Sequence, residues 1–160
     1  MVDFVSGVSD TDRAGIEAAM EAAGILDAWV TPDGRLLDTD DTTIVAQDAV
    51  PGPALASVLV PAIDPADDHA ATLTETGINA VLRAIGLGPN GSTWVDVDGR
   101  FAIGVLSGAW HKDSAIYIGE GARESARRGR LADLRSELER LRQARTEFSD
   151  WPARQGSPAS

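Results

Sequence analysis

The fold is predicted best by the stretch Trp94-Val95-Asp96-Val97-Asp98-Gly99-Arg100-Phe101-Ala102-Ile103-Gly104-Val105-Leu106. Two arms rich in β-branched, aromatic and other apolar residues flank the dipeptide Asp98-Gly99. A two-residue Asp-Gly link between such arms is the strongest short-range signal for a β-hairpin. We therefore expect an antiparallel hairpin here and place the other elements around it.

Two helices and several short strands are predicted before and after the hairpin. Apolar residues at helical spacing predict a helix over residues 10–23, capped by Asp10 or Thr11 and stopped by Gly24. A second helix over residues 72–85 begins at Thr72 or Thr74. The expected strands are the apolar runs 26–30, 43–46, 57–60 and 115–118, the last being a strand or a lead-in to a helix, with a turn at Thr31-Pro32-Asp33-Gly34. This order predicts an α/β or α+β fold with a mixed β-sheet of about five to seven strands and packed helices.

The C-terminal part has a different pattern. Residues 120–147 contain no proline, and leucines recur at 3-4-3 spacing, which is typical of a coiled-coil helix. The apolar seam is narrow and the rest of the surface is charged, so this helix needs a partner helix. The seam residues are Leu131, Leu134, Leu138 and Leu141. We expect a globular domain over residues 1–121, a coiled-coil arm over 122–148 and a disordered tail over 149–160.

Charge is distributed unevenly along the chain, whose net charge is −11. Residues 1–121 hold 5 basic and 19 acidic side chains, whereas residues 122–148 hold 8 arginines and 5 acids. Phosphate binding depends on Lys and Arg, so the globular part should repel nucleic acid. Any DNA contact is expected to be weak or indirect, at Arg127, Arg128 and Arg130 on the C-terminal helix.

The composition also excludes cysteine-dependent chemistry and indicates where in the cell the protein is expected. The absence of cysteine excludes disulfides, thiolate zinc sites and a cysteine nucleophile. Neither a signal peptide nor an apolar run of the about 20 residues that span a bilayer is recognisable. We expect a cytoplasmic protein without a membrane partner.

Motifs that resemble catalytic or binding loops are incomplete. The glycine-rich segment 86–93 has Ser92 where a phosphate-binding loop needs lysine, and Asp96-Val97-Asp98-Gly99 fits a hairpin turn better than a calcium loop. His69 follows two aspartates and His111 precedes Asp113, so a small ligand-binding or hydrolytic α/β domain that uses either histidine remains an alternative. The main prediction is a chain with no catalytic residue, metal or cofactor.

Residues before the C-terminal helix are candidates for a dimer interface. Trp29, Trp94 and Trp110 are expected in the core by default, but tryptophan is also enriched at the centres of interfaces. Glycines that crowd this region serve turns or allow close approach of two subunits. The predicted interface residues are Gly104, Gly108, Trp110, Tyr117 and Gly119.

Several segments in order resemble one family. They are Val2-Asp3-Phe4 with Gly7-Val8, Leu26-Asp27-Ala28-Trp29-Val30 with Pro32-Asp33-Gly34, Gly108-Ala109-Trp110-His111-Lys112, Ala115-Ile116-Tyr117-Ile118-Gly119, and Ala122-Arg123-Glu124-Ser125-Ala126-Arg127-Arg128. Over roughly residues 2–145 the chain resembles the hinge region of bacterial SMC-like ATPases, the JetC component of Wadjet-type plasmid-defence systems.

The resemblance implies an SMC-hinge-like fold and a non-catalytic role. The globular part would form a homodimer that joins two coiled-coil arms of a DNA-processing complex. Residues 122–148 would begin the returning arm, and the outgoing arm of the parent chain would precede Val2 and pair with it. ATP hydrolysis would belong to head domains outside this chain.

Overall fold

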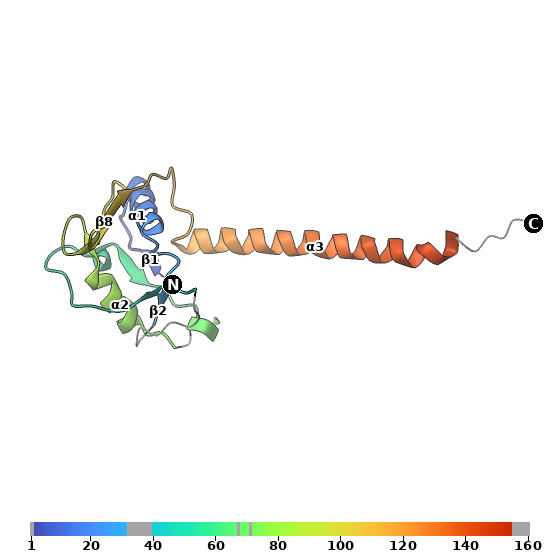
Figure 1. Cartoon of the computed structure of the whole chain (residues 1–160), viewed down its shortest axis with the longest axis horizontal. Coiled ribbons are helices and arrows are strands. Elements are labelled where there is room, and N and C mark those ends of the chain that lie inside the picture. The colour runs from blue at the N-terminus through green and yellow to red at the C-terminus, as the bar shows by residue number, and fades with distance from the viewer. Residues whose placement is uncertain (1, 32–39, 67, 71, 155–160) are drawn as a thin grey trace, which may run out of the picture. The chain divides into compact units, whose positions relative to one another are not determined.

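The computed structural model describes residues 2–31, 40–66, 68–70 and 72–154. It divides into two compact units, Met1–Ala122 and Arg123–Ser160 (Figure 1). The first unit contains the short strands and two helices, and the second is a continuation of the long helix α3 (Glu120–Arg154). The sequence places this boundary between residues 121 and 122.

The described strands form three small sheets and not one. β1 (Val2–Phe4) pairs antiparallel with β4 (Leu59–Pro61), and β2 (Trp29–Val30) pairs parallel with β3 (Thr43–Ile44). The third sheet has the order β5-β6-β7-β8, in which only β5–β6 is parallel. Its strands are β5 (Gly86–Leu87), β6 (Thr93–Val95), β7 (Arg100–Ile103) and β8 (Leu106–Ala109). The mixed α and β class is confirmed, but the single mixed sheet is wrong for the described residues.

A side-chain cap precedes helix α1 (Asp10–Ala22), and a glycine follows its C-terminal end. Its cap is Ser9 and neither of the predicted caps, Asp10 and Thr11. The Ser9 hydroxyl accepts a hydrogen bond from the N–H of Asp12. At the other end Gly24 has φ of +73°, and Ile25 N–H donates to Met20 C=O, which is the hydrogen bond of a Schellman motif. The predicted stop at Gly24 is confirmed.

Helix α2 (Glu75–Ala84) begins at one of the two predicted caps. The Thr74 hydroxyl accepts from the N–H of Gly77 at 3.0 Å. The helix buries Ile78, Val81 and Leu82, and these residues join Ile16, Leu55 and Leu59 in the core of the globular unit. Short 3-10 turns, η1 (Leu55–Ser57) and η2 (Asp68–Ala70), lie between β3 and α2.

The predicted hairpin is confirmed, with a longer turn and an earlier end. Residues 96–99 connect β6 to β7, so the two-residue Asp-Gly link is wrong. The buried Asp96 organises this turn: its Oδ1 accepts from the N–H groups of Asp98 and Arg100, and its Oδ2 accepts from Arg100 Nε. The second predicted arm breaks at Gly104, where φ of +56° starts a two-residue turn into β8.

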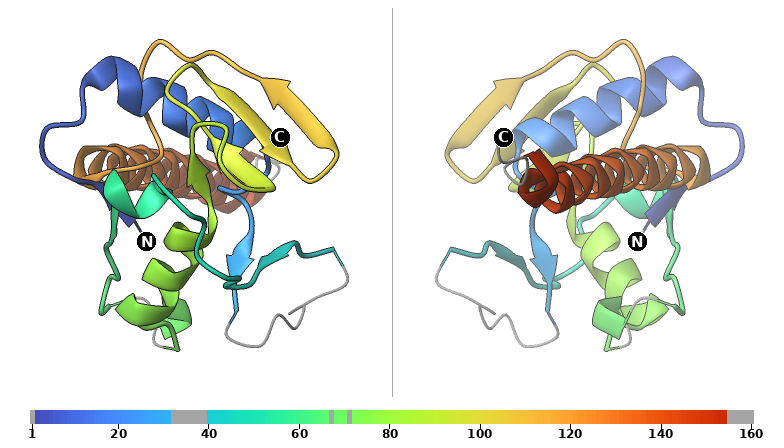
Figure 2. Two further views of the ribbon diagram at one scale, coloured as in Figure 1. Left: turned by 90° about the vertical axis from the view of Figure 1, so that its left-hand side faces the viewer. Right: turned by 90° about the vertical axis from the view of Figure 1, so that its right-hand side faces the viewer.

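Helix α1 packs against this hairpin sheet. It contacts β6, β7 and β8, and both views in Figure 2 show it running alongside them. The approach is close, because a Cβ added at Gly15 would lie 1.7 Å from the carbonyl oxygen of Val97. Glycine is therefore required there by the neighbouring backbone.

The strand expected at residues 115–118 and the disordered tail expected from residue 149 are corrected. Residues 115–118 form no strand, because the N–H groups of Ile116, Tyr117 and Ile118 bind the Glu17 carboxylate. The other alternative is confirmed, because the segment leads into α3. Residues 149–154 are helical and not disordered, whereas residues 155–160 lie outside the described residues. The turn expected at residues 32–34 also lies outside them.

Candidate functional site

Strand β8 is an edge strand that is exposed along its whole length. It pairs with β7 on one side, and no described strand pairs with its other side. All four of its residues are exposed. The exposed fractions are 67% for Leu106, 58% for the following Trp110 and 102% for Val105 in the preceding turn. We call residues 105–110 the β8 edge.

The register identifies which backbone groups of the β8 edge turn outward. Phe101 lies opposite Gly108, and Trp110 N–H donates to Gly99 C=O. Hydrogen-bonded and non-hydrogen-bonded pairs alternate along an antiparallel ladder. Leu106, Gly108 and Trp110 therefore direct their backbone groups toward β7, and Ser107 and Ala109 direct theirs away from it. Unpaired groups of this kind are a template for another strand.

A glycine in this edge leaves room for a neighbouring aromatic ring. A Cβ added at Gly108 would lie 2.8 Å from Cε1 of Phe101, so the Phe101 ring covers the strand at this point. Gly104, in the turn, has no neighbour within 4 Å of an added Cβ. Three of the five predicted interface residues therefore lie on one hairpin: Gly104, Gly108 and Trp110.

The other two predicted interface residues belong to a separate loop. Tyr117 and Gly119 lie between β8 and α3, and Gly119 has φ of +116°. The Tyr117 ring centroid lies 4.2 Å from Lys112 Nζ, a cation–π contact within the chain. The tryptophans also differ from the default expectation of core packing, because Trp29 and Trp110 are both exposed.

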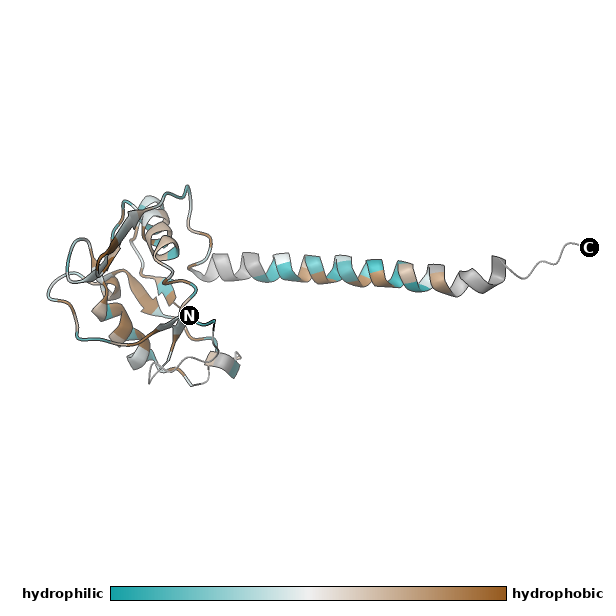
Figure 3. Ribbon diagram, viewed as in Figure 1, coloured by the Kyte–Doolittle hydropathy of each residue, from teal (hydrophilic) through white to brown (hydrophobic). Residues whose placement is uncertain are grey.

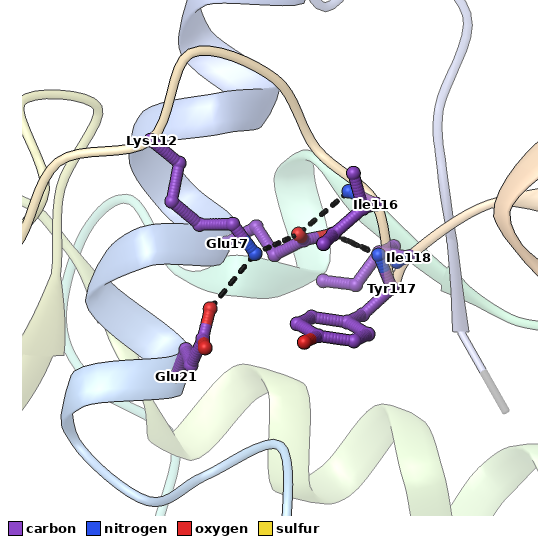
Figure 4. Close-up of polar contacts among 6 residues, drawn as sticks. All are labelled: Glu17, Glu21, Lys112, Ile116, Tyr117 and Ile118. Atoms are coloured by element: carbon purple, nitrogen blue, oxygen red, sulfur yellow. Dashed lines mark hydrogen bonds and ion pairs between the residues drawn. The ribbon is translucent and has the colours of Figure 1, made fainter.

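A buried carboxylate holds this loop against α1 (Figure 4). The Glu17 side chain is fully buried, and Lys112 Nζ donates to its Oε1 at 2.6 Å. Three consecutive backbone N–H groups donate to the same carboxylate, from Ile116, Tyr117 and Ile118, at 2.7 to 2.9 Å. We call Glu17, Lys112 and these three N–H groups the Glu17 anchor.

Opposing effects act on the two charges of the anchor. Burial raises the pKa of Glu17, but the bonds from Lys112 and from the backbone N–H groups of the loop outweigh it, so the pKa is lowered. Burial lowers the pKa of Lys112, but its bonds to Glu17 and Glu21 and their negative charges outweigh it, so the pKa is raised. Both groups are therefore charged at neutral pH.

Glu17 is not among the functional residues predicted from the sequence. Its neighbours Ile16, Ala18 and Ala19 are buried, so an acid in the middle of an apolar helix face was the available signal. The other signal is that Lys112 is the one lysine of the sequence.

The predicted coiled-coil seam lies on α3 and is exposed. Leu131, Leu134, Leu138 and Leu141 are between 44% and 59% exposed. Figure 3 shows hydrophobic positions recurring among hydrophilic ones along this helix. Arg127, Arg128 and Arg130 lie on the same helix and are exposed. We call the four leucines the leucine stripe.

His111 forms no metal or acid–base site among the described residues. His111 Nε2 lies 3.4 Å from Asp113 Oδ1, with side chains 87% and 102% exposed. His69 lies in η2, and its side chain is outside what the structure describes. In the described part of the chain, no group of three or more His, Cys, Asp or Glu side chains could hold a metal ion.

A cavity of about 550 Å³ lies in the globular unit. Its walls are mainly apolar side chains of α1, α2 and the short strands, with Glu21, Asp27 and Tyr117 as the polar members. His111 is not among the lining residues. The volume is typical of small-molecule sites.

Comparisons with known proteins add no identification, because no family model, no curated protein and no solved structure matches the chain. Among the described residues, no helix combines the length and apolar character that crossing a membrane requires.

Proposed function

We propose that the chain is a non-catalytic dimerisation module in which the globular unit joins two copies and α3 serves as a coiled-coil arm. The observation that carries the proposal is the β8 edge, whose exposed strand combines outward backbone groups with the apolar side chains of Leu106 and Trp110. An added strand satisfies such groups, and tryptophan is enriched at interface centres.

The leucine stripe supports the second half of the proposal. Four exposed leucines at 3-4-3 spacing on a helix of 35 residues are typical of a seam that pairs with another helix. The role is that of a hinge in an SMC-like DNA-processing ATPase of a plasmid-defence system. In that role the outgoing arm of the parent chain covers the stripe, and ATP hydrolysis takes place in separate head domains.

The test is the mass of the chain in solution, measured so that the two surfaces are separated. Leu134→Glu/Leu138→Glu disables the leucine stripe, and we expect light scattering to give twice the 16.8 kDa of one chain for this variant. Adding Leu106→Lys places a charge on the β8 edge, and we expect the mass of one chain. If the stripe variant is already monomeric at high concentration, the globular unit is not the dimerisation module.

The cavity supports a second candidate function, a domain that binds a small apolar ligand. It has the volume and apolar lining of such sites. A thermal-shift screen with small apolar compounds tests it, with Val81→Trp as a variant that fills the cavity. Stabilisation of the native chain and not of this variant would support ligand binding over a purely structural role.

A further inference from the structure

The β8 edge offers outward backbone groups at only two of its strand residues, Ser107 and Ala109. A second β8 can bond to it only where outward groups of one copy meet outward groups of the other. In a symmetric antiparallel pair, the register can be centred on Ser107, Gly108 or Ala109. Centring on Ser107 sets Ala109 opposite the partner's Val105, and centring on Ala109 sets Ser107 opposite the partner's His111. Val105 and His111 both lie outside the strand.

Centring on Gly108 keeps every hydrogen bond within the two strands. Ser107 then lies opposite the partner's Ala109, and Ala109 lies opposite the partner's Ser107, so that both pairs exchange N–H···O bonds. We propose that two copies of this chain associate in this register, with the two-fold axis passing beside Gly108 and a continuous sheet running from one copy to the other. The proposal rests on the dimerisation function proposed above.

The side chains of the β8 edge are complementary in this register. Leu106 lies opposite the partner's Trp110, at a non-hydrogen-bonded position where facing side chains come closest. Symmetry repeats the pair on the other side of the axis, so both exposed apolar residues of each copy gain a partner. At the axis Gly108 faces its own copy without a side chain, and the Phe101 ring above it adds an aromatic surface.

Charge does not oppose a second copy at the β8 edge, although it does elsewhere on the globular unit. Residues 1–121 hold 19 acidic and 5 basic side chains, so two such units repel each other over most of their surface. Residues 102–110 contain no charged side chain. The β8 edge is therefore a place where two copies can meet without opposing like charges.

Cysteine cross-linking tests the register, because the native chain contains no cysteine. The variant Leu106→Cys/Trp110→Cys places each thiol opposite the other position in the partner. The two positions are about 13 Å apart along one strand, too far for a disulfide within a chain. We expect oxidation to give a covalent dimer that a reductant reverses.

Three single variants are the matched controls. In the expected register, the two thiols of a Leu106→Cys dimer lie diagonally apart, and so do those of a Trp110→Cys dimer. The Ser107→Cys thiol faces the partner's Ala109, which has no thiol. None of the three single variants should therefore cross-link. These variants are made in the Leu134→Glu/Leu138→Glu background, so that α3 does not supply the contact. There, a dimer by light scattering that cross-links through Ser107→Cys, or that fails to cross-link in the double variant, overturns the register and leaves dimerisation through the globular unit standing. A chain that remains monomeric at every concentration overturns both.

Discussion

Lys112 Nζ lies 2.6 Å from Glu17 Oε1 and 2.8 Å from Glu21 Oε2, so the one lysine of the sequence bridges two carboxylates of α1. Glu17 is fully buried, and Glu21 is partly exposed. The same Glu17 carboxylate binds the loop that leads into α3. The Glu17 anchor therefore connects α1 with the segment immediately before the proposed arm.

We predict that Glu17→Gln destabilises the globular unit by about 3 kcal/mol, because the amide removes the charge that pairs with Lys112 and turns a donor toward backbone N–H groups. Urea unfolding followed by circular dichroism measures the loss. Glu21→Gln is the matched control, and its loss should stay below about 1 kcal/mol because this carboxylate is partly exposed. Equal losses in the two variants would contradict the anchor.

The pH dependence of stability should carry the signature of Glu17. Its folded pKa is lowered, so its contribution is present above the unfolded value of about 4.3 and is lost as the pH falls through the folded value. The difference in unfolding free energy between the native chain and Glu17→Gln should shrink between pH 7 and pH 3. A difference that stays constant over this range would count against the assignment.

The contribution of Lys112 to the unfolding free energy should have the opposite pH dependence and be lost at alkaline pH. Its folded pKa is raised, so its contribution is present below the unfolded value of about 10.4 and is lost as the pH rises through the folded value. The difference in unfolding free energy between the native chain and Lys112→Met should therefore be constant from pH 7 to pH 9. A decline within that interval would contradict a raised pKa of Lys112, because the lysine would then lose its proton below pH 9.

Two glycine-to-alanine changes in helices should have opposite effects. Alanine favours helix by about 1 kcal/mol over glycine, and Gly129 in α3 has open space around an added Cβ. Gly15 in α1 has the carbonyl oxygen of Val97 at 1.7 Å from that position. Gly129→Ala should raise the helicity measured by circular dichroism, whereas Gly15→Ala should lower the melting temperature of the globular unit. An unchanged or higher melting temperature for Gly15→Ala would contradict the close packing of α1 on the turn.

Local signals in the sequence predicted the local structure well. Thr74 and Gly24 are found at the helix ends they predict, and the hairpin forms around Asp98-Gly99. Each of these signals acts over a few residues of chain, so the sequence contains both sides of the interaction within one window.

Long-range partners could not be predicted in the same way. β1 pairs with β4 more than fifty residues later, and Glu17 binds Ile116 at a separation of 99 residues. Neither a three-residue strand nor one acid in a helix identifies its partner through spacing. The same limit explains why the exposed edge at Ser107 became visible only when the order of the strands was known.

The most direct test of the central claim is sedimentation equilibrium of Ser107→Pro in the Leu134→Glu/Leu138→Glu background. Ser107 N–H points away from β7, so proline removes a donor to a partner strand without removing a bond within the chain. Ser107→Thr keeps that N–H and is the matched control. We expect a dimer for the background and for Ser107→Thr, and a monomer for Ser107→Pro. A dimer of unchanged affinity in the proline variant would contradict it.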